Sequence, residues 1–222
     1  MMHYIKSFLR PKGKLNFVRS LPEGVKILDV GCGNFSVLPI KKLKKKCYYV
    51  GLDVENYNQS DESIFLMDEY ILTTPELFSR KIEESGVGFD AIICSHNIEH
   101  VSQREQTLSE ILNKDNANGM LYLSFPSKDS LEFPSRKGTL NYFDDRGHVY
   151  PPPDFLKIKE MLIEHGFNLE YCNQNYRPWL LRVVGFLFEP LSLLSSRVLV
   201  GTWELYGFES VIWAKKNSPP CR

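Results

Sequence analysis

The sequence lacks the features that identify disulfide-rich, membrane-spanning and strongly charged proteins. Its 222 residues include only five cysteines, an odd number that never occurs as C-x-x-C, so neither a disulfide framework nor a zinc knuckle is expected. Runs of about 18 residues without a charge are also missing, which argues against a membrane-spanning helix. The 27 basic and 27 acidic residues balance. The chain therefore offers no broad positive field for a nucleic acid, and we expect reduced thiols and no nucleic-acid partner.

A single domain is expected over residues 1–222. The length suits one full hydrophobic core, and the sequence contains no internal repeat and no low-complexity segment. The opening residues, MMHYIKSFLRPKGK, lack the apolar stretch of a signal peptide. We therefore expect a cytoplasmic protein, with peripheral membrane contact through residues 179–200 as an additional hypothesis.

Short β-rich runs alternate with helical patterns, which is typical of a wound α/β sheet. The predicted strands are Lys26–Val30, Tyr48–Asp53, Ser63–Met67, Phe89–Cys94, Leu121–Phe125, Phe167–Cys172 and Ser210–Lys215. The predicted helices are Val37–Lys45, Pro75–Ser85, Gln103–Asn113 and Pro153–His165. Right-handed crossovers should place the first five strands in a parallel sheet. Two insertions, at about 127–150 and 173–200, interrupt the pattern and are predicted to form a lid over an acceptor.

The stretch VKILDVGCGNF places two glycines, one residue apart, directly after an apolar strand. Gly31 and Gly33 let backbone N–H groups approach a nucleotide, because a β-carbon would block that approach. Gly31, Gly33 and Ser36 come near the dinucleotide spacing G-x-G-x-x-G/A, but Ser36 is neither glycine nor alanine. In proteins that bind S-adenosylmethionine, a carboxylate commonly lies two residues before the first glycine. Asp29 occupies that position.

Two further carboxylates are predicted at the same edge of the sheet. Asp53 ends the second predicted strand, where a carboxylate can accept hydrogen bonds from ribose hydroxyls in either cofactor class. Asp68 follows the third predicted strand, and an acid there suits the exocyclic amino group of adenine. Each aspartate alone is equally compatible with a loop cap. Their positions at the carboxyl ends of successive strands, where ligands of open α/β sheets bind, favour a cofactor site.

The sequence resembles class I S-adenosylmethionine-dependent methyltransferases. ILDVGCGN resembles the first motif of that family, YYVGLDVEN its second strand, FDAIICSHNIEHV its fourth strand and NGMLYLSFPS its fifth. LIEHGF with FESVIWAKK resembles its closing β-hairpin. The similarity runs from Leu21 to Lys216, is weak over the two insertions, and departs at Phe35, where many members carry a third glycine. It implies a Rossmann-like α/β three-layer sandwich whose seven-stranded, mostly parallel sheet ends in an antiparallel hairpin.

The resemblance also implies the cofactor, its contacts and the reaction. S-adenosylmethionine would contact Asp29, Gly31, Cys32, Gly33, Asp53, Asp68, Ser95 and His96, with its adenine between Val54 and Met67. The implied reaction is methyl transfer to a small-molecule, glycan or lipid-linked acceptor, to oxygen rather than nitrogen. DDRGH is faintly similar to a D-x-T-H element of glycan- and lipid-pathway methyltransferases. The alternatives are an NAD(P)-dependent oxidoreductase on a Rossmann sheet and a binding module that has lost catalysis.

His100 and His148 are the candidate catalytic residues. HNIEH, at residues 96–100, also fits the zinc-protease signature H-x-x-E-H, but it follows a predicted strand instead of lying on a long helix, so no metal is expected. His100 either packs against the next helix or positions the cofactor or acceptor. His148 follows the fifth strand, and its imidazole is suited to accept a proton near neutral pH, oriented by Asp144 or Asp145. The structural alternative for His148 is a solvated loop residue.

The most apolar stretch is WLLRVVGFLFEPLSLLSSRVLV, residues 179–200. Arg182, Glu189, Pro190 and Arg197 interrupt it, so it does not qualify as a membrane span. The pattern is compatible with a helical lid, a dimer surface, a membrane-interface segment or ordinary core helices. An interfacial helix would suit a lipid-linked acceptor. The sequence does not predict an oligomeric state.

Overall fold

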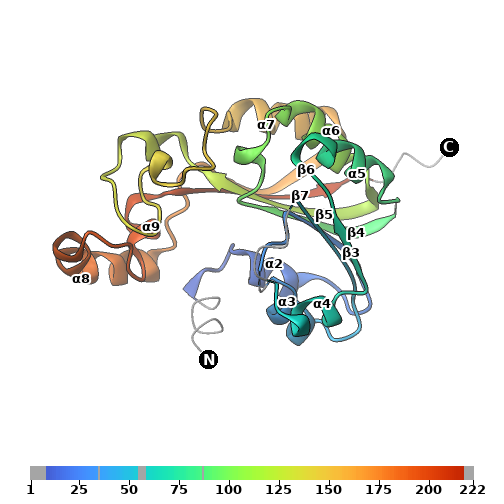
Figure 1. The fold of residues 1–222 in the computed structure, drawn as a ribbon, viewed down its shortest axis with the longest axis horizontal. Coiled ribbons are helices and arrows are strands. Elements are labelled where there is room, and N and C mark those ends of the chain that lie inside the picture. Colours follow the sequence, from blue (N-terminus) through green and yellow to red (C-terminus); the bar gives the residue numbers. More distant parts are fainter. Residues whose placement is uncertain (1–8, 35, 55–58, 87, 218–222) are drawn as a thin grey trace.

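A seven-stranded sheet forms the middle layer of the computed structural model, which describes residues 9–34, 36–54, 59–86 and 88–217 (Figure 1). Phe35, the departure noted above, lies outside these ranges. The strands are β1 (Lys26–Val30), β2 (Tyr48–Asp53), β3 (Glu69–Leu72), β4 (Phe89–Ser95), β5 (Asp115–Pro126), β6 (Phe167–Asn173) and β7 (Glu209–Lys216), in the order β3-β2-β1-β4-β5-β7-β6. β1 to β5 run parallel, and β7 is antiparallel to both of its neighbours. The predicted fold class is confirmed.

Helices cover both faces of the sheet. One face carries α2 (Lys14–Ser20), α3 (Val37–Leu43) and α4 (Asp61–Leu66), and the other carries α5 (Phe78–Glu84), α6 (Arg104–Leu112) and α7 (Phe155–Glu164) (Figure 1). Short 3₁₀ turns lie at η1 (Pro75–Leu77), η2 (Ile98–His100), η3 (Lys128–Glu132) and η4 (Tyr142–Asp144). Two more helices, α8 (Trp179–Ser195) and α9 (Thr202–Tyr206), lie beyond the end of the sheet.

The core divides between the two faces because successive side chains of a strand point to opposite sides. Leu28 of β1 packs in the cluster that includes α5, α6 and α7 side chains, whereas Ile27 packs in the cluster that includes α2 and α3 side chains. The strands are therefore buried on both faces, as expected of a parallel sheet. The accessible part of the sheet is therefore the edge at the carboxyl ends of the parallel strands, where a functional site can form.

The third strand is not where the sequence analysis placed it. Residues Ser63–Met67 were predicted as a strand, but Asp61–Leu66 form α4 and the strand follows at Glu69–Leu72. The hydroxyl of Ser60 accepts a hydrogen bond from the Ser63 N–H at 3.1 Å and so caps the helix. A short apolar run is compatible with either structure, and the cap decides in favour of the helix.

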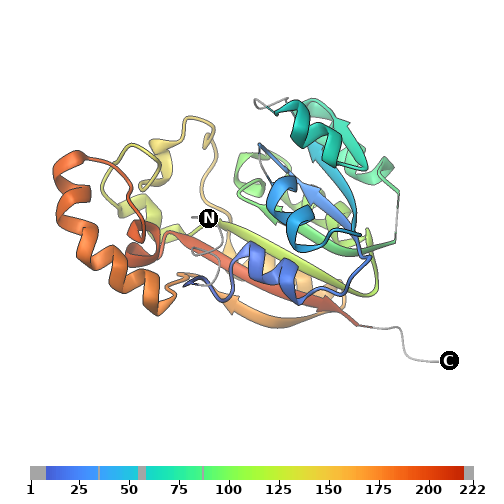
Figure 2. The same cartoon turned by 90° about the horizontal axis from the view of Figure 1, so that it is seen from below.

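The two insertions pack against each other at one end of the molecule, and we call residues 127–150 together with α8 and α9 the insertion lobe (Figures 1 and 2). Arg136 donates hydrogen bonds to Glu189 of α8 at 2.6 and 2.9 Å, and Trp203 of α9 donates to the carbonyl of Thr139 at 2.7 Å. Within the described ranges, no helix has the length and apolarity needed to cross a membrane. The lobe lies at the carboxyl ends of β4 and β5.

Candidate functional site

The glycine turn after β1 is joined to the end of β2 by Asp53. The Gly31 N–H donates to the Leu52 carbonyl at 2.8 Å, and the Gly33 N–H donates to Asp53 Oδ2 at 2.6 Å. Asp53 Oδ1 accepts from the Val54 N–H at 2.8 Å, and the side chain is buried. Gly31 and Gly33 have φ of +69° and +53°, a conformation that favours glycine. The backbone of the glycine turn and the carboxylate of Asp53 therefore form one continuous surface at the ends of β1 and β2.

Asp29 supports this turn from inside the protein. Its Oδ2 accepts hydrogen bonds from the Ser36 hydroxyl at 2.5 Å and the Tyr49 hydroxyl at 2.7 Å. Burial, together with the nearby Asp29 carboxylate, raises the pKa of Tyr49 well above its usual range, so this phenol stays a donor. Ser36, which does not fit the dinucleotide spacing, therefore serves as a hydrogen-bond donor to Asp29.

Several buried polar atoms around the turn have no hydrogen-bond partner among the described residues. They are Asp29 Oδ1, Asn34 Oδ1, Gln59 Oε1, Thr73 Oγ1 and Asn97 Oδ1. Gln59 donates to the Gly33 carbonyl, and the Thr73 N–H donates to the Asp53 carbonyl at 3.0 Å, so both border the same edge. Buried polar groups are normally paired. Unpaired ones gathered here fit a polar ligand such as the S-adenosylmethionine that the sequence implies.

Asn97 is a site residue that the sequence analysis missed. A β-carbon on Gly31 would lie 2.3 Å from Asn97 Nδ2, so the Asn97 amide fills the space over the turn. Ser95, predicted to contact the cofactor, has its hydroxyl 3.0 Å from that of Ser124 on β5. The feature of the sequence that could have identified Asn97 is its position directly after the Ser95–His96 turn. We therefore place Asn97, rather than the His96 side chain, beside Gly31.

His96 points toward the insertion lobe. Its Nδ1 lies 3.2 Å from Glu99 Oε1, and its Nε2 lies 3.1 Å from Glu209 Oε1. Its ring stacks on Phe208 and lies 5.3 Å from the ring of Trp203 on α9. A φ of +51° is unusual for a residue other than glycine, and such backbone strain is concentrated at functional sites. The contact predicted between the Ser95–His96 turn and the cofactor stays a prediction, and the His96 side chain itself is turned toward the insertion lobe.

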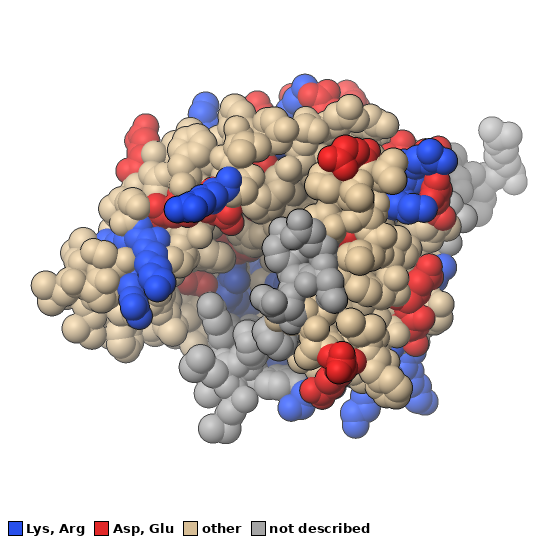
Figure 3. Space-filling model, viewed as in Figure 1, with Lys and Arg blue, Asp and Glu red and all other residues tan. Residues whose placement is uncertain are grey.

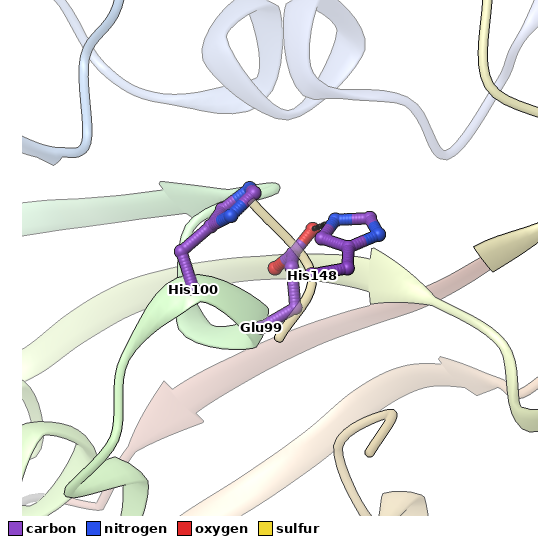
Figure 4. Close-up of side chains that lie close together, drawn as sticks. All are labelled: Glu99, His100 and His148. Atoms are coloured by element: carbon purple, nitrogen blue, oxygen red, sulfur yellow. Dashed lines mark ion pairs between the residues drawn. The ribbon is translucent and has the colours of Figure 1, made fainter. Parts of the chain in front are cut away.

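Glu99, His100 and His148 lie close together beside His96 (Figure 4). One ligating atom from each lies within 4.8 Å of the other two. His148 is buried rather than solvated, and its Nδ1 lies 2.5 Å from the Tyr142 carbonyl, so Nδ1 carries the proton and Nε2 holds a lone pair. Nε2 lies 3.9 Å from Glu99 Oε1. The cluster offers proton acceptors on the side of the site that faces the lobe.

Neither predicted aspartate orients His148. Asp144 accepts hydrogen bonds from backbone N–H groups within 136–141. Burial alone would raise the pKa of Asp144, but these bonds outweigh it and hold the pKa below its usual value. Asp145 accepts from the Gly147 N–H at 2.8 Å. Both side chains shape the loop, and the Tyr142 carbonyl takes over the orienting role predicted for them.

Asp68 lies near the start of β2, whereas Asp53 lies at the carboxyl end of that strand. The Asp68 carboxylate accepts from the N–H of Tyr49, near the start of β2, at 2.6 Å, and forms an ion pair with Lys41. Burial would raise the pKa of Asp68, but the hydrogen bonds from Lys41 and Tyr49 outweigh it and lower the pKa. The predicted adenine contact from Asp68 is wrong, because β3 begins after this residue rather than before it.

Two of the other predicted cofactor contacts, Met67 and Cys32, are buried, and Val54 is partly buried. Met67 belongs to the cluster on the α2–α3 face, whereas Val54 packs against the cluster on the other face, so the structure does not bring them together. The Cys32 thiol lies beside Gly51. Burial, with added repulsion from nearby carboxylates, raises the pKa of Cys32 far above its usual value, so the thiol is no nucleophile. The four described cysteines are all free of disulfides.

Comparison with known proteins agrees with this fold. The family described as "Methyltransferase domain" matches residues 1–171. No curated protein sequence matches the chain. Among solved structures, a SAM-dependent methyltransferase from Archaeoglobus fulgidus is 18% identical with a TM-score of 0.57, covering 97% of this chain and 95% of that one. One from Mesorhizobium loti is 15% identical with a TM-score of 0.59, covering 91% and 95%. The cyclopropane synthase MmaA2 from Mycobacterium tuberculosis is 17% identical with a TM-score of 0.58, covering 91% and 83%. These structural likenesses show the fold.

Proposed function

The chain belongs to the methyltransferase-domain family and is an S-adenosylmethionine-dependent enzyme, and from this premise we propose that it methylates a hydroxyl oxygen of a lipid-linked acceptor. The observation that supports this acceptor class is the exposed apolar face of α8 in the insertion lobe. Small-molecule and glycan acceptors are the alternative outcomes of the tests below. Because the chain belongs to the methyltransferase family, we do not retain the alternative of an NAD(P)-dependent oxidoreductase.

The residues divide into a cofactor side and an acceptor side. S-adenosylmethionine supplies a methyl group bonded to a positively charged sulfur. An acceptor oxygen forms the new C–O bond while the C–S bond breaks and its electron pair stays on sulfur. On the cofactor side, Asp53 and the glycine turn hold the adenosyl group in line with the acceptor. On the acceptor side, we assign the uptake of the hydroxyl proton to His100 and the Nε2 of His148, which lie close together. This proton-accepting cluster favours oxygen as the methylated atom.

The outer face of α8 is apolar where a soluble helix is normally polar. Its exposed residues recur at helical spacing and form what we call the α8 stripe: Trp179, Val183, Phe186, Leu187, Leu191 and Leu194. Phe186 is 71% and Leu194 85% exposed. The opposite face, with Leu181 and Gly185, is buried against α9. Of the four alternatives for residues 179–200, this exposed apolar face supports a surface helix rather than an ordinary core helix.

Charge around the α8 stripe suits an anionic lipid surface. Arg182 lies on α8 and Arg197 directly after it, and both are exposed. Figure 3 shows a group of basic side chains bordering the end of the molecule that carries α8. Apolar residues on one side with basic residues beside them are typical of helices that lie in a membrane interface. A membrane surface is the partner that we propose for this face.

The acceptor class can be tested directly with S-adenosylmethionine carrying a radioactive methyl group. We expect the purified protein to transfer label to a chloroform–methanol lipid extract, with mass spectrometry placing the added methyl group on a hydroxyl oxygen. Heat-inactivated protein is the control. Label found only in a water-soluble glycan fraction, or on an amine, would refute the lipid-linked hydroxyl.

Vesicle binding provides a separate test of the α8 stripe. The triple variant Phe186→Ser, Leu187→Ser and Leu194→Ser should bind vesicles of phosphatidylglycerol and phosphatidylcholine about tenfold or more weakly than the parent in co-sedimentation, because it loses buried apolar area. The matched control, Leu156→Ser with Ile163→Ser, changes residues of α7 that are 63% and 59% exposed and should bind like the parent. Equal binding of all three proteins would contradict the membrane surface. A parent dimer that the triple variant dissociates would instead identify a dimer surface.

A further inference from the structure

We propose that Glu99, His100 and His148 form a binding site for one divalent transition-metal ion at the acceptor side of the methyl-transfer site. The three side chains come from η2 and from the loop after β5, and Figure 4 shows them converging. The sequence analysis expected no metal, because HNIEH follows a predicted strand instead of lying on a long helix. The tertiary structure supplies His148 in place of His96.

Glu99 gives the strongest indication of a missing partner. Its side chain is completely buried, and Oε2 has no hydrogen-bond partner among the described residues. Oε1, in contrast, lies 3.2 Å from His96 Nδ1. A buried carboxylate oxygen without a partner is costly, because it loses its hydration without compensation. A cation bound by the Glu99 carboxylate would offset that cost.

His148 is oriented in the way that metal-binding histidines are. Its Nδ1–H donates to the Tyr142 carbonyl, which leaves the lone pair of Nε2 on the side of Glu99. The ring is held between that of Tyr142, at 4.3 Å, and that of His100, at 4.7 Å. A hydrogen bond from the second ring nitrogen to a backbone carbonyl is the usual means of fixing the tautomer of a metal ligand.

His100 completes the set on the solvent side. It is exposed, so a cation bound there would keep open positions toward an incoming acceptor. Metal bonds of about 2.0–2.2 Å place ligand atoms roughly 3–4 Å apart. Ligand atoms within 4.8 Å of one another reach that spacing by small side-chain rotations. Two imidazoles and one carboxylate suit zinc, manganese or iron in the divalent state.

The bound ion would activate the acceptor, and this role rests on the proposed O-methylation. A divalent cation lowers the pKa of a hydroxyl bound to it and so makes the oxygen a better nucleophile. With the ion bound, His100 and His148 are metal ligands and no longer proton acceptors, so the ion replaces the activating role proposed for them above, and the hydroxyl proton leaves to water. The oxygen lone pair forms the C–O bond, the C–S bond breaks, and no electron is exchanged with the metal.

Metal binding is tested on the full chain after dialysis against a chelator. Calorimetric titration with Zn²⁺, and with Co²⁺ followed by its visible absorption, should show one ion per chain. Glu99→Gln and His148→Ala should weaken this site at least tenfold. His100→Ala should do the same, and because His100 is exposed, this variant is expected to fold even if the buried ones do not. His165→Ala is the matched control, since His165 lies near Ser109 and Met161 instead.

The outcomes separate this site from the methyltransferase function. If the parent binds no ion, or if the three ligand variants bind it as the parent does, the metal site is refuted. Methyl transfer that proceeds undiminished in chelator would refute the activating role of the ion while leaving the O-methylation intact. Binding of one ion, lost in His100→Ala but kept in His165→Ala, together with transfer that depends on added metal, would support the proposal.

Discussion

Asp53→Ala is expected to weaken the binding of S-adenosylmethionine by about 10- to 100-fold, whereas Asp68→Ala leaves it unchanged. Hydrogen bonds to a charged group contribute about 1.5–3 kcal/mol, which corresponds to this range of affinity. Asp53 holds the Gly33 N–H and ends β2 at the carboxyl edge of the sheet, where ligands of this architecture bind. Calorimetric titration of the two variants and the parent measures the difference.

The Asp68→Ala variant is the control for Asp53→Ala. Both substitutions remove a carboxylate near β2, and both residues were candidates in the sequence. Asp68 lies instead at the amino end, beside Tyr49 and Lys41. Melting temperatures would show whether either variant is unfolded. Parent-like affinity in Asp53→Ala, or a loss in Asp68→Ala equal to that in Asp53→Ala, would refute the assignment of the ribose contact to Asp53.

Arg136→Met is expected to lower the free energy of unfolding of the insertion lobe by about 3–5 kcal/mol, the cost of leaving one member of a buried ion pair alone. The guanidinium donates to both carboxylate oxygens of Glu189, to the Ser192 hydroxyl at 2.6 Å and to the Tyr206 hydroxyl at 3.2 Å. These bonds join residues 127–150 to α8 and α9. Urea unfolding, together with the rate of proteolysis within the lobe, measures the loss.

A double variant separates the unpaired charge from the lost contact. Arg136→Met with Glu189→Leu removes both charges and should recover most of the lost stability. The pair also predicts a pH dependence, because hydrogen bonds from Arg136 lower the pKa of Glu189 below its ordinary value of 4.5. The stabilisation is therefore present above about pH 4.5 and is lost as the pH falls through the lowered pKa. A double variant no more stable than Arg136→Met, or a parent lobe whose stability does not fall in acid, would contradict this account.

Most strands could be predicted from the sequence because their apolar runs are long enough and are bounded by turn residues. The third strand could not. The run at 63–67 is too short for periodicity to distinguish a strand from a helix, and the Ser60 cap makes it α4. That one shift moved Asp68 to the opposite end of the sheet and separated Met67 from Val54. An error in a short element thus displaced two predicted cofactor contacts, Asp68 and Met67.

The sequence by itself determined the glycine turn and the position of Asp53 at the end of the second strand, because the conformation of a turn and the end of a strand depend on neighbouring residues. It also identified His100 and His148 as candidates, but not their partners. The tertiary structure alone brought Glu99 and His148 together, turned His96 toward the insertion lobe and placed Asn97 over Gly31. Those contacts join separate segments of the chain, and their geometry depends on how the loops after β4 and β5 pack.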